Sequence, residues 1–381
     1  MRRMFGLLGL VVIVAPLAAC FAPPATTLST AVGSLTLPWD VQWTPGADPV
    51  MLLTERPGRL EAVVGGRTRT IAAPSDLLSQ YESGMMGLAI DPAFASNRRV
   101  YTCMHSSVAG GVGDIRVVRW AVNATFTGTT SRADIVTGIP VNTAGHAGQH
   151  SGCRPRFGPD GALWIGTGDS WTGSVPQDKQ SLGGKVLRVG TDGAGVAPNP
   201  GVGANGDHSF DPRIYSYGHR NVQGIAFRPS DGKAFSVEQG TTCDDEVNQL
   251  LPGGNYGWDP LGAGGAYDET HPMTDLTKYP AAVPAVWTSG CPTIATSGAG
   301  FVTGSQWGRW NGMLVIGCLK GSELFGVMLD SAGTKTLGTS STLTDHGRLR
   351  TPAQGPDGSL YVTTGAGSAD SILALRPQPP T

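Results

Sequence analysis

The sequence predicts an all-β protein, a six-bladed β-propeller with four-stranded blades, and three observations lead to this prediction. The chain has 381 residues, of which 56 are Gly and 28 are Pro, well above the combined share of about 12% that is usual for these two residues. This composition indicates many tight turns and argues against a helix bundle. A phrase of two short apolar strands around a turn recurs six times. No long amphipathic helical period competes with the strand pattern.

The recurring phrase supplies two strands to each expected blade. In every copy, apolar residues alternate around a turn that contains Pro, Asp or Gly, as in a β-hairpin. Roughly 50 to 80 residues separate the copies, which is enough for four strands and a loop. We expect residues 35–37 to close the ring beside residues 372–375 in the last blade. The alternative architecture is a pair of stacked β-sandwiches. The six copies begin at Val41, Leu88, Pro155, Ile225, Phe301 and Thr351.

Residues 1–20 predict a lipoprotein signal peptide. Arg2 and Arg3 precede an apolar run over residues 7–19, which is too short to span a bilayer comfortably. The run ends in Leu-Ala-Ala-Cys at Cys20, which resembles the lipobox of bacterial lipoproteins, where the cysteine is lipidated and becomes the mature N-terminus. We therefore expect an exported protein, lipid-anchored through Cys20 to the outer face of the cell membrane. The alternative is a soluble periplasmic or secreted protein that is cut nearby.

Composition and charge describe the rest of the chain. Residues 21–33 are rich in Ala, Pro, Thr and Ser and predict a flexible tether, and residues 34–381 then form the propeller as a catalytic domain. The formal net charge of −2 argues against a nucleic-acid-binding surface. Export permits disulfides. The sequence contains no Cys-x-x-Cys pair, which is the spacing typical of a zinc site. We expect one or two bridges and one buried thiol, with the pairing left open, among Cys103, Cys153, Cys243, Cys291 and Cys318.

Residues that can carry chemistry gather at the ends of the repeats. His150 enters the third repeat and Asp169 leaves it, so the two side chains can meet across one hairpin and form an oriented imidazole base. Arg348 and Arg350 stand at positions i and i+2, which point the same way in a strand. A propeller brings the equivalent ends of its blades around one axis, so the cations at these ends predict a site for a polyanion. They are Arg220, Lys320, Arg348 and Arg350.

A series of motifs, taken in order, resembles one family. The sequence is similar to the quinoprotein glucose/sorbosone dehydrogenases, also called soluble aldose sugar dehydrogenases dependent on pyrroloquinoline quinone (PQQ). The resemblance extends from about residue 37 to residue 375, which is nearly the whole chain after the signal peptide. The motifs that carry it occupy residues 150–152, 157–161, 166–169, 182–188, 217–224, 244–248, 253–258, 292–295, 319–321 and 348–350.

The resemblance implies a six-bladed propeller that holds PQQ on its top face and oxidises an aldose at the anomeric carbon to the lactone. Electrons would pass to a periplasmic or artificial acceptor. PQQ carries three carboxylates and an ortho-quinone, and Arg can bind a carboxylate through two hydrogen bonds. The positions that match the family's cofactor-binding residues are Glu82, His150, Arg220, Asn221, Thr293, Lys320, Arg348 and Arg350.

The resemblance also assigns catalytic and metal-binding roles. His150 matches the family's general base, Asp169 would hold the other nitrogen of its imidazole, and Arg220 completes the catalytic set. Ca²⁺ would bind against the quinone through the backbone carbonyls of Gly240 and Thr241 and act as a Lewis acid. The acidic residues 244–246 are expected to brace this loop rather than to bind the metal directly.

Three residues depart from the family's pattern. Glu82 stands where members often carry Gln, Cys291 where some place an aromatic residue, and Thr241 where Pro is common. An acid beside a trianion is repelled unless it is paired or protonated.

The sequence leaves two functions other than a dehydrogenase open. One alternative is a lactonase-type propeller, a hydrolase whose channel Ca²⁺ needs Asn, Asp and Glu from several blades. The other is a cofactor-free propeller that binds glycans or a protein partner.

Overall fold

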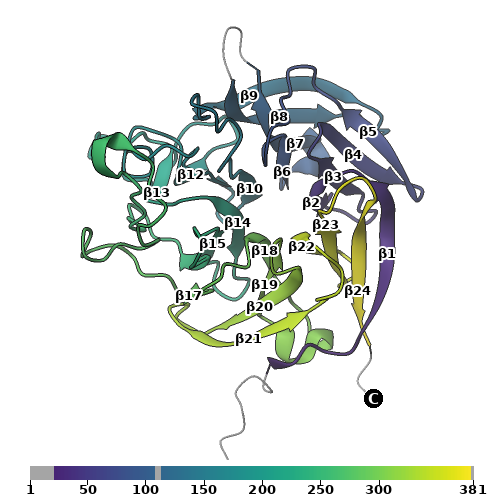
Figure 1. The fold of residues 1–381 in the computed structure, drawn as a ribbon. Helices are drawn as coiled ribbons and strands as arrows, with labels where there is room; N and C mark the ends of the chain where they lie inside the picture. Colours follow the sequence, from purple (N-terminus) through teal and green to yellow (C-terminus); the bar gives the residue numbers. More distant parts are fainter. Residues whose placement is uncertain (1–20, 108–112, 379–381) are drawn as a thin grey trace, which may run out of the picture.

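Six four-stranded sheets surround a central axis in the computed structural model, which describes residues 21–107 and 113–378 (Figure 1). This is the six-bladed propeller that the repeats predict. In the described part of the chain, helix is limited to α1 (Phe94–Asn97) and two short 3₁₀ helices, η2 (Ala263–Gly265) and η3 (Ser305–Trp310). None of the helices in these residues has the length and apolar character that a membrane crossing requires.

The first three blades each consist of four strands that follow one another in the chain. Their strands are β2 (Pro38–Trp43), β3 (Met51–Glu55), β4 (Arg59–Val64) and β5 (Arg67–Ala72); β6 (Met85–Ile90), β7 (Arg99–Ser106), β8 (Asp114–Val122) and β9 (Thr129–Ile139); and β10 (Arg154–Phe157), β11 (Leu163–Gly166), β12 (Lys185–Val189) and β13 (Ile214–Tyr217).

The fourth and fifth blades repeat this order, and the sixth combines both ends of the chain. Their strands are β14 (Val222–Phe227), β15 (Ala234–Glu238), β16 (Glu246–Gln249) and β17 (Trp287–Thr288); β18 (Thr296–Phe301), β19 (Leu314–Cys318), β20 (Glu323–Leu329) and β21 (Thr336–Thr342); and β22 (Leu349–Gln354), β23 (Leu360–Thr364), β24 (Asp370–Pro377) and β1 (Thr26–Leu35).

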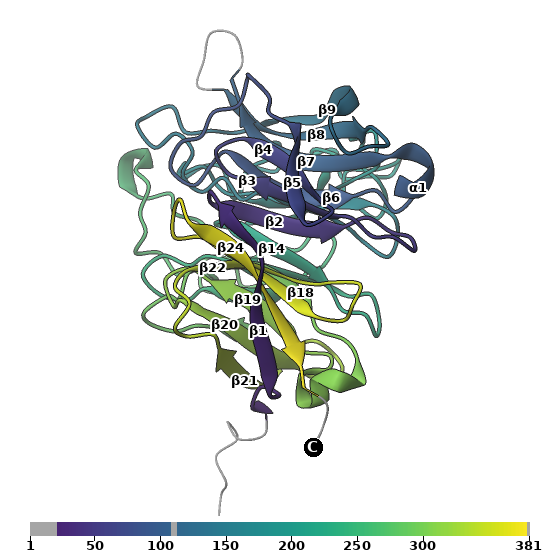
Figure 2. The same cartoon turned by 90° about the vertical axis from the view of Figure 1, so that its right-hand side faces the viewer.

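The ring closes through β1, which is the outermost strand of the sixth blade. It pairs antiparallel with β24, with Leu28 opposite Leu375 and Leu35 opposite Asp370, and the two strands run side by side in Figure 2. Closure at the two chain ends was expected, but it begins further upstream than residues 35–37. The structure places a strand over most of residues 21–33, where composition predicted a flexible tether. The signal peptide, with Cys20, lies outside the described residues.

The first strand of every blade lies nearest the axis. β2, β6, β10, β14, β18 and β22 contact one another in that order, and β22 contacts β2. All six predicted copies form the first two strands of a blade. In two of the turns between these strands, Gly161 and Gly358 have φ values of +76° and +77°, a region that glycine enters without the steric cost of a Cβ atom. The recurring phrase is therefore the inner hairpin of each blade.

The hydrophobic core lies between neighbouring blades. Tyr101 of the second blade and Leu187 of the third belong to one cluster of buried side chains, and Val315 of the fifth blade and Val362 of the sixth belong to another. A sheet with two apolar faces must bury both, and in a ring each face packs against the next blade. This packing holds the inner strands, and the residues at their ends, in fixed positions.

Two disulfides and one buried thiol account for the five cysteines. Cys103 in β7 is bonded to Cys153 just before β10, which joins the second and third blades. Cys243 and Cys291 are bonded between the loop after β15 and the segment before β18. Cys318 is a buried free thiol, and burial raises its pKa well above the usual range. The predicted number of bridges and the buried thiol are confirmed.

Candidate active site

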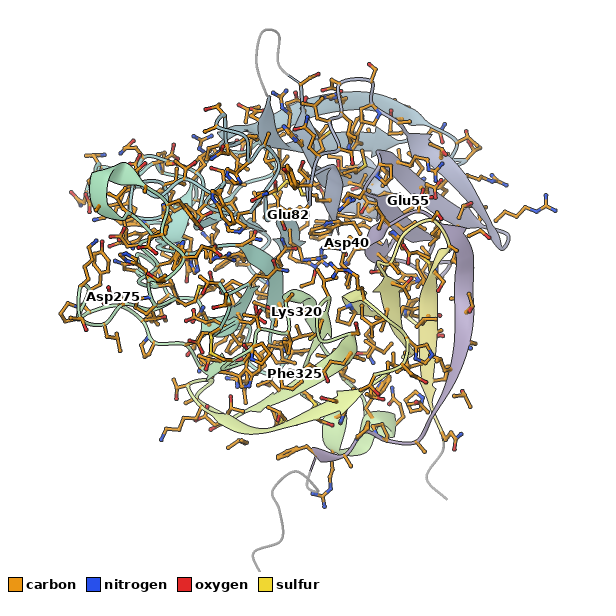
Figure 3. All side chains as sticks on the ribbon, viewed as in Figure 1. Asp40, Glu55, Glu82, Asp275, Lys320 and Phe325 are labelled. Carbon is orange, nitrogen blue, oxygen red and sulfur yellow. A yellow bond between two sulfur atoms is a disulfide. The ribbon has the colours of Figure 1, made fainter. Side chains whose placement is uncertain are left out.

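One end of the propeller carries a cavity of about 460 Å³ that is lined by residues from all six blades. Each lining residue stands near the start of its blade's first strand or the end of its second, so all of them belong to the same end of the ring. Figure 3 places the labelled Glu82 and Lys320 near the centre of the ring. Each blade contributes at least one lining residue; from the first blade to the sixth, examples are Arg56, Glu82, His150, Gln239, Leu319 and Arg350.

His150 and Asp169 meet across the β10–β11 hairpin. Arg154 pairs with Gly166 in the strand register, which brings the segment before β10 beside the segment after β11. His150 Nδ1 lies 2.8 Å from Asp169 Oδ1, and the His150 side chain is 9% exposed. Among the described residues no side chain or backbone group binds Nε2 of His150. The ring therefore has one nitrogen held by a carboxylate and the other available to a ligand in the cavity.

Four donors surround the buried carboxylate of Asp169. Oδ1 accepts hydrogen bonds from His150 and from the backbone N–H of Trp171 at 2.9 Å. Oδ2 accepts hydrogen bonds from Trp258 Nε1 and from the Tyr267 hydroxyl, both at 2.7 Å. Burial alone raises the pKa of Asp169, but the charge and hydrogen bond of His150, with Arg220 and Tyr267, outweigh it and lower that pKa below its usual value. Asp169 is therefore an anion with all its lone pairs engaged.

Three arginines from two blades face the same cavity. Arg348 and Arg350 both line it, as their i, i+2 spacing predicts, and Arg56 joins them from the segment after β3. Burial lowers the pKa of Arg350 to about 10, and the nearby charges of Arg56 and Arg348 add to this effect while Glu82 opposes it. Burial also lowers the pKa of Arg56, and its Nε is buried without a hydrogen-bond partner in the described structure. Positive charge is thus concentrated here beyond what local acids neutralise.

Glu82 is anchored beside these arginines. Its carboxylate accepts hydrogen bonds from Ser151 N at 3.2 Å, from Asn221 Nδ2 at 3.3 Å and from Gln223 Nε2 at 3.1 Å. Its charge raises the pKa of both Arg56 and Arg350. The acid is therefore held by three neutral donors and lies within reach of the charges of two arginines, and both kinds of neighbour stabilise a carboxylate next to an anionic ligand.

Arg220 and Lys320 lie near the cavity but do not line it. Arg220 is buried, donates to Gln239 O at 3.0 Å and forms an ion pair with Glu269. Burial lowers the pKa of Arg220, but Tyr267, Glu269 and Asp169 together raise it above its usual value. Lys320 is exposed, and its Nζ lies 3.5 Å from Thr293 Oγ1.

The loop that follows β15 is tied at both ends. Gly240 N donates to Asp245 Oδ1 at 2.9 Å, and Asp245 Oδ2 accepts from Ile294 N at 2.7 Å. The buried Asp245 therefore braces the loop through backbone groups, as expected for the acids of this segment. The carbonyl oxygens of Gly240 and Thr241 accept no hydrogen bond from any described residue. They remain available to a hard cation, which prefers oxygen ligands.

The sequence matches the family described as glucose/sorbosone dehydrogenase over residues 35–373. The chain belongs to this family. It is therefore an oxidoreductase. The chain is 31% identical over 356 residues to an uncharacterised protein of Synechocystis, covering 87% of this chain and 82% of that protein. It is 27% identical over 367 residues to the aldose sugar dehydrogenase YliI of Escherichia coli, covering 94% and 95%.

A solved structure extends the comparison to the whole fold. The PQQ-bound form of an aldose sugar dehydrogenase from Streptomyces coelicolor has a TM-score of 0.73 and 29% identity to this chain, covering 93% of this chain and 99% of that one. The two folds are thus similar over nearly their whole length.

The structure brings most of the predicted site residues to one end of the ring. Glu82, His150, Arg348 and Arg350 line the cavity, and Asn221 binds Glu82. The remaining predicted residues lie around it: Asp169 behind His150, Arg220 beside Asp169, and Thr293 with Lys320 at the segment before β18 and the segment after β19.

Three residues of the site were not predicted from the sequence. Trp258 and Tyr267 bind Asp169 across 89 and 98 residues of sequence, and no local pattern predicts such a contact. Arg56 was also missed, although a signal was present. It lies in the segment just after the second strand of the first repeat, and the same segment contains Asp169 in the third repeat and Lys320 in the fifth.

Proposed function

We propose that the dehydrogenase uses PQQ as its cofactor and oxidises an aldose at its anomeric carbon to the lactone. The observation that carries the proposal is the gathering of Arg56, Arg348 and Arg350 around one cavity that also receives the imidazole of His150. Glu82 is the one acidic side chain among the described residues that line it. The PQQ-bound relative from Streptomyces coelicolor and the aldose sugar dehydrogenase of Escherichia coli support the same cofactor and substrate class.

The residues of the cavity fit a flat, triply negative molecule. Arg56 has a buried Nε without a partner in the described structure, and the lowered pKa of Arg350 reflects burial among like charges. A bound carboxylate relieves both, since it supplies acceptors and opposite charge where the protein lacks them. Lys320 and Thr293 stand close enough to each other to bind one further polar group of the ligand.

The chain's own part in the reaction is to hold the sugar and remove a proton from it. When bound, PQQ supplies a two-electron acceptor for the hydrogen of the anomeric carbon. Nε2 of His150 accepts the proton of the anomeric hydroxyl while Nδ1 donates to Asp169. The anionic Asp169 fixes the tautomer and stabilises the imidazolium that results.

The loop at Gly240 and Thr241 fits Ca²⁺. Its two carbonyl oxygens lack hydrogen bonds from the described residues, and Asp245 holds the loop from behind. When bound by these carbonyls, the ion would supply a Lewis acid. No group of three or more His, Cys, Asp or Glu side chains in the described ranges could hold a metal, so the backbone carbonyls are the ligands that the proposal assigns.

Reconstitution tests the proposal. Purified protein is titrated with PQQ in the presence of Ca²⁺, and dye reduction is measured with D-glucose, D-galactose, D-xylose and maltose. We expect saturable quinone absorbance on the protein and dye reduction that depends on an aldose. Failure of saturating PQQ to bind, or of every aldose to support dye reduction, would refute the proposal. Sugar binding without PQQ binding would favour the cofactor-free propeller.

We further propose that the dehydrogenase acts outside the cytoplasm, anchored by lipid on Cys20 or free in the periplasm or medium, and passes electrons to an acceptor there. The apolar run that ends at Cys20 supports this proposal. Labelling of cells with a palmitate analogue should depend on Cys20, with Cys20→Ser as the matched variant. Export of unlabelled wild-type protein would remove the anchor from the proposal.

A further inference from the structure

Tyr81 is an aromatic side chain that stands exposed at the cavity. It lines the cavity together with Glu82 and His150. Its side chain is 62% exposed, more than any other large apolar or aromatic residue in the described part of the chain. Large aromatic residues usually bury their surface, so a tyrosine left in solvent beside a ligand cavity invites a functional explanation.

The backbone at Tyr81 adopts a conformation that side chains disfavour. Its φ is +48°, in the left-handed region where a Cβ atom approaches the following carbonyl. Such residues persist only where their surroundings impose the conformation, and they are frequent at ligand-binding sites.

The neighbours of Tyr81 do impose it. Gln80 O accepts hydrogen bonds from Ser83 N at 2.9 Å and from Ser83 Oγ at 2.8 Å, which closes a turn around Tyr81. Ser83 Oγ also lies 2.9 Å from the buried His105 Nδ1. Glu82 is held by Ser151 and Gln223. Both sides of Tyr81 are thus fixed to the blades, and the turn presents its ring at a defined place.

No aromatic ring pair or hydrogen bond among the described residues includes Tyr81, whereas Trp171 and Tyr267 contact the ring of His150. Tyr81 is 62% exposed and lines the cavity. Its exposed surface is therefore available to a ligand in the cavity.

We propose that Tyr81 is a specificity-determining residue that packs its ring against one face of the aldose. This inference rests on the proposed function. The cavity residues already described supply cations and a base, which suit carboxylates and a hydroxyl but not the C–H face of a pyranose. An aromatic ring binds such a face by close packing, and a tyrosine adds a hydroxyl at its edge. The other apolar side chains that line the cavity are the aliphatic Ala295 and Leu319, so Tyr81 supplies its aromatic surface.

The test compares Tyr81→Ala, Tyr81→Phe and Tyr81→Gly with Leu337→Ala, which removes a side chain that is 52% exposed on β21. Three quantities are measured: the Kd of PQQ by quenching of tryptophan fluorescence, saturation-transfer NMR of D-glucose on the PQQ-loaded protein, and KM and kcat for the four sugars. We expect Tyr81→Ala to raise KM about three- to tenfold, to weaken the saturation-transfer signal, and to leave kcat and the Kd of PQQ nearly unchanged. Tyr81→Phe and Leu337→Ala should behave like the wild type.

Other outcomes overturn the inference. A weaker Kd of PQQ in Tyr81→Ala with an unchanged KM would make Tyr81 a cofactor contact, and equal losses in Tyr81→Ala and Tyr81→Phe would assign the contact to the hydroxyl. Tyr81→Gly should lose sugar affinity while the apoprotein keeps or raises its melting temperature, because glycine relieves the left-handed strain. A lower melting temperature would make the role of Tyr81 structural. Wild-type protein that binds neither PQQ nor D-glucose refutes the proposed function as well, whereas wild-type activity without any change in Tyr81→Ala refutes this inference alone.

Discussion

Asp169→Asn is the substitution that most directly tests how the imidazole of His150 is held. The carboxylate of Asp169 accepts four hydrogen bonds, two on each oxygen. An amide of the same shape offers one oxygen that accepts and one nitrogen that only donates. One pair of donors must therefore face the nitrogen, and each pair contains a group that cannot become an acceptor: the backbone N–H of Trp171 or Nε1 of Trp258.

The two orientations of the amide have different costs. If its nitrogen faces Trp258 and Tyr267, the hydroxyl of Tyr267 can rotate but Trp258 Nε1 stays unpaired, and His150 keeps its tautomer without its counter-charge. If the nitrogen faces His150, the imidazole must accept at Nδ1, which puts the proton on Nε2 and removes the base. Either way one buried donor is left unsatisfied, at a cost of about 1–3 kcal/mol in stability. Loss of an oriented general base lowers kcat about 10²- to 10⁴-fold.

Three measurements separate these effects. The free energy of unfolding of Asp169→Asn is measured by urea titration, PQQ affinity by fluorescence, and kcat by dye reduction at saturating sugar. Tyr267→Phe is the matched control, because it removes the hydroxyl that donates to Asp169 Oδ2 at 2.7 Å but keeps the charge of Asp169. This variant should lower kcat by about tenfold at most. A kcat for Asp169→Asn equal to that of the wild type, in protein that is folded and binds PQQ, would refute the role assigned to the His150–Asp169 pair.

Three further predictions follow from single contacts. Arg350→Gln should weaken PQQ binding about ten- to a hundredfold without loss of stability, since this arginine is buried among like charges, whereas Arg376→Gln, on an exposed side chain, should leave the Kd of PQQ unchanged. Burial, with the charge of Glu238, raises the pKa of Glu246 to about 8. The free energy of unfolding should therefore fall as the pH rises from about 4.5 to about 8. Glu246→Gln should flatten this pH dependence, and an unchanged dependence would contradict the raised pKa. The buried Lys185 donates to three carbonyl oxygens at 2.6–3.0 Å, so Lys185→Met should cost about 3 kcal/mol or more in urea unfolding, with the exposed Lys335→Met as the control.

The inner half of each blade could be predicted because its signal is local. The two strands of a hairpin and their turn lie within about twenty residues of sequence, so alternation and turn residues report directly on the contact that forms. The outer strands carry less of this signal. Thr26–Leu35 is mostly exposed apart from Leu35, since one strand at the edge of a blade buries little. Its composition is therefore that of a tether, although its threonines suit a strand and β24 supplies the partner.

In the site, too, contacts between residues close in sequence could be predicted, and contacts between distant residues could not. The contact of His150 with Asp169 spans one hairpin and could be predicted, whereas Arg220 meets Glu269 across 49 residues, through a loop whose path no local pattern describes. Loop-borne partners such as Tyr267 depend on how the segment between β16 and β17 returns to the axis, and that path is set by packing rather than by alternation.

Arg56 could have been predicted from its place in the repeat. In a closed ring, the residues just after the second strand of each blade reach the same end of the axis, whatever their neighbours in sequence. Arg56 is the first residue after β3 and Lys320 the second after β19, so this rule includes both. The family motifs lie in the third to sixth blades, and Arg56 of the first blade lies outside them. The place of a segment in the repeat therefore indicates, together with the motifs, which side chains reach this end of the ring.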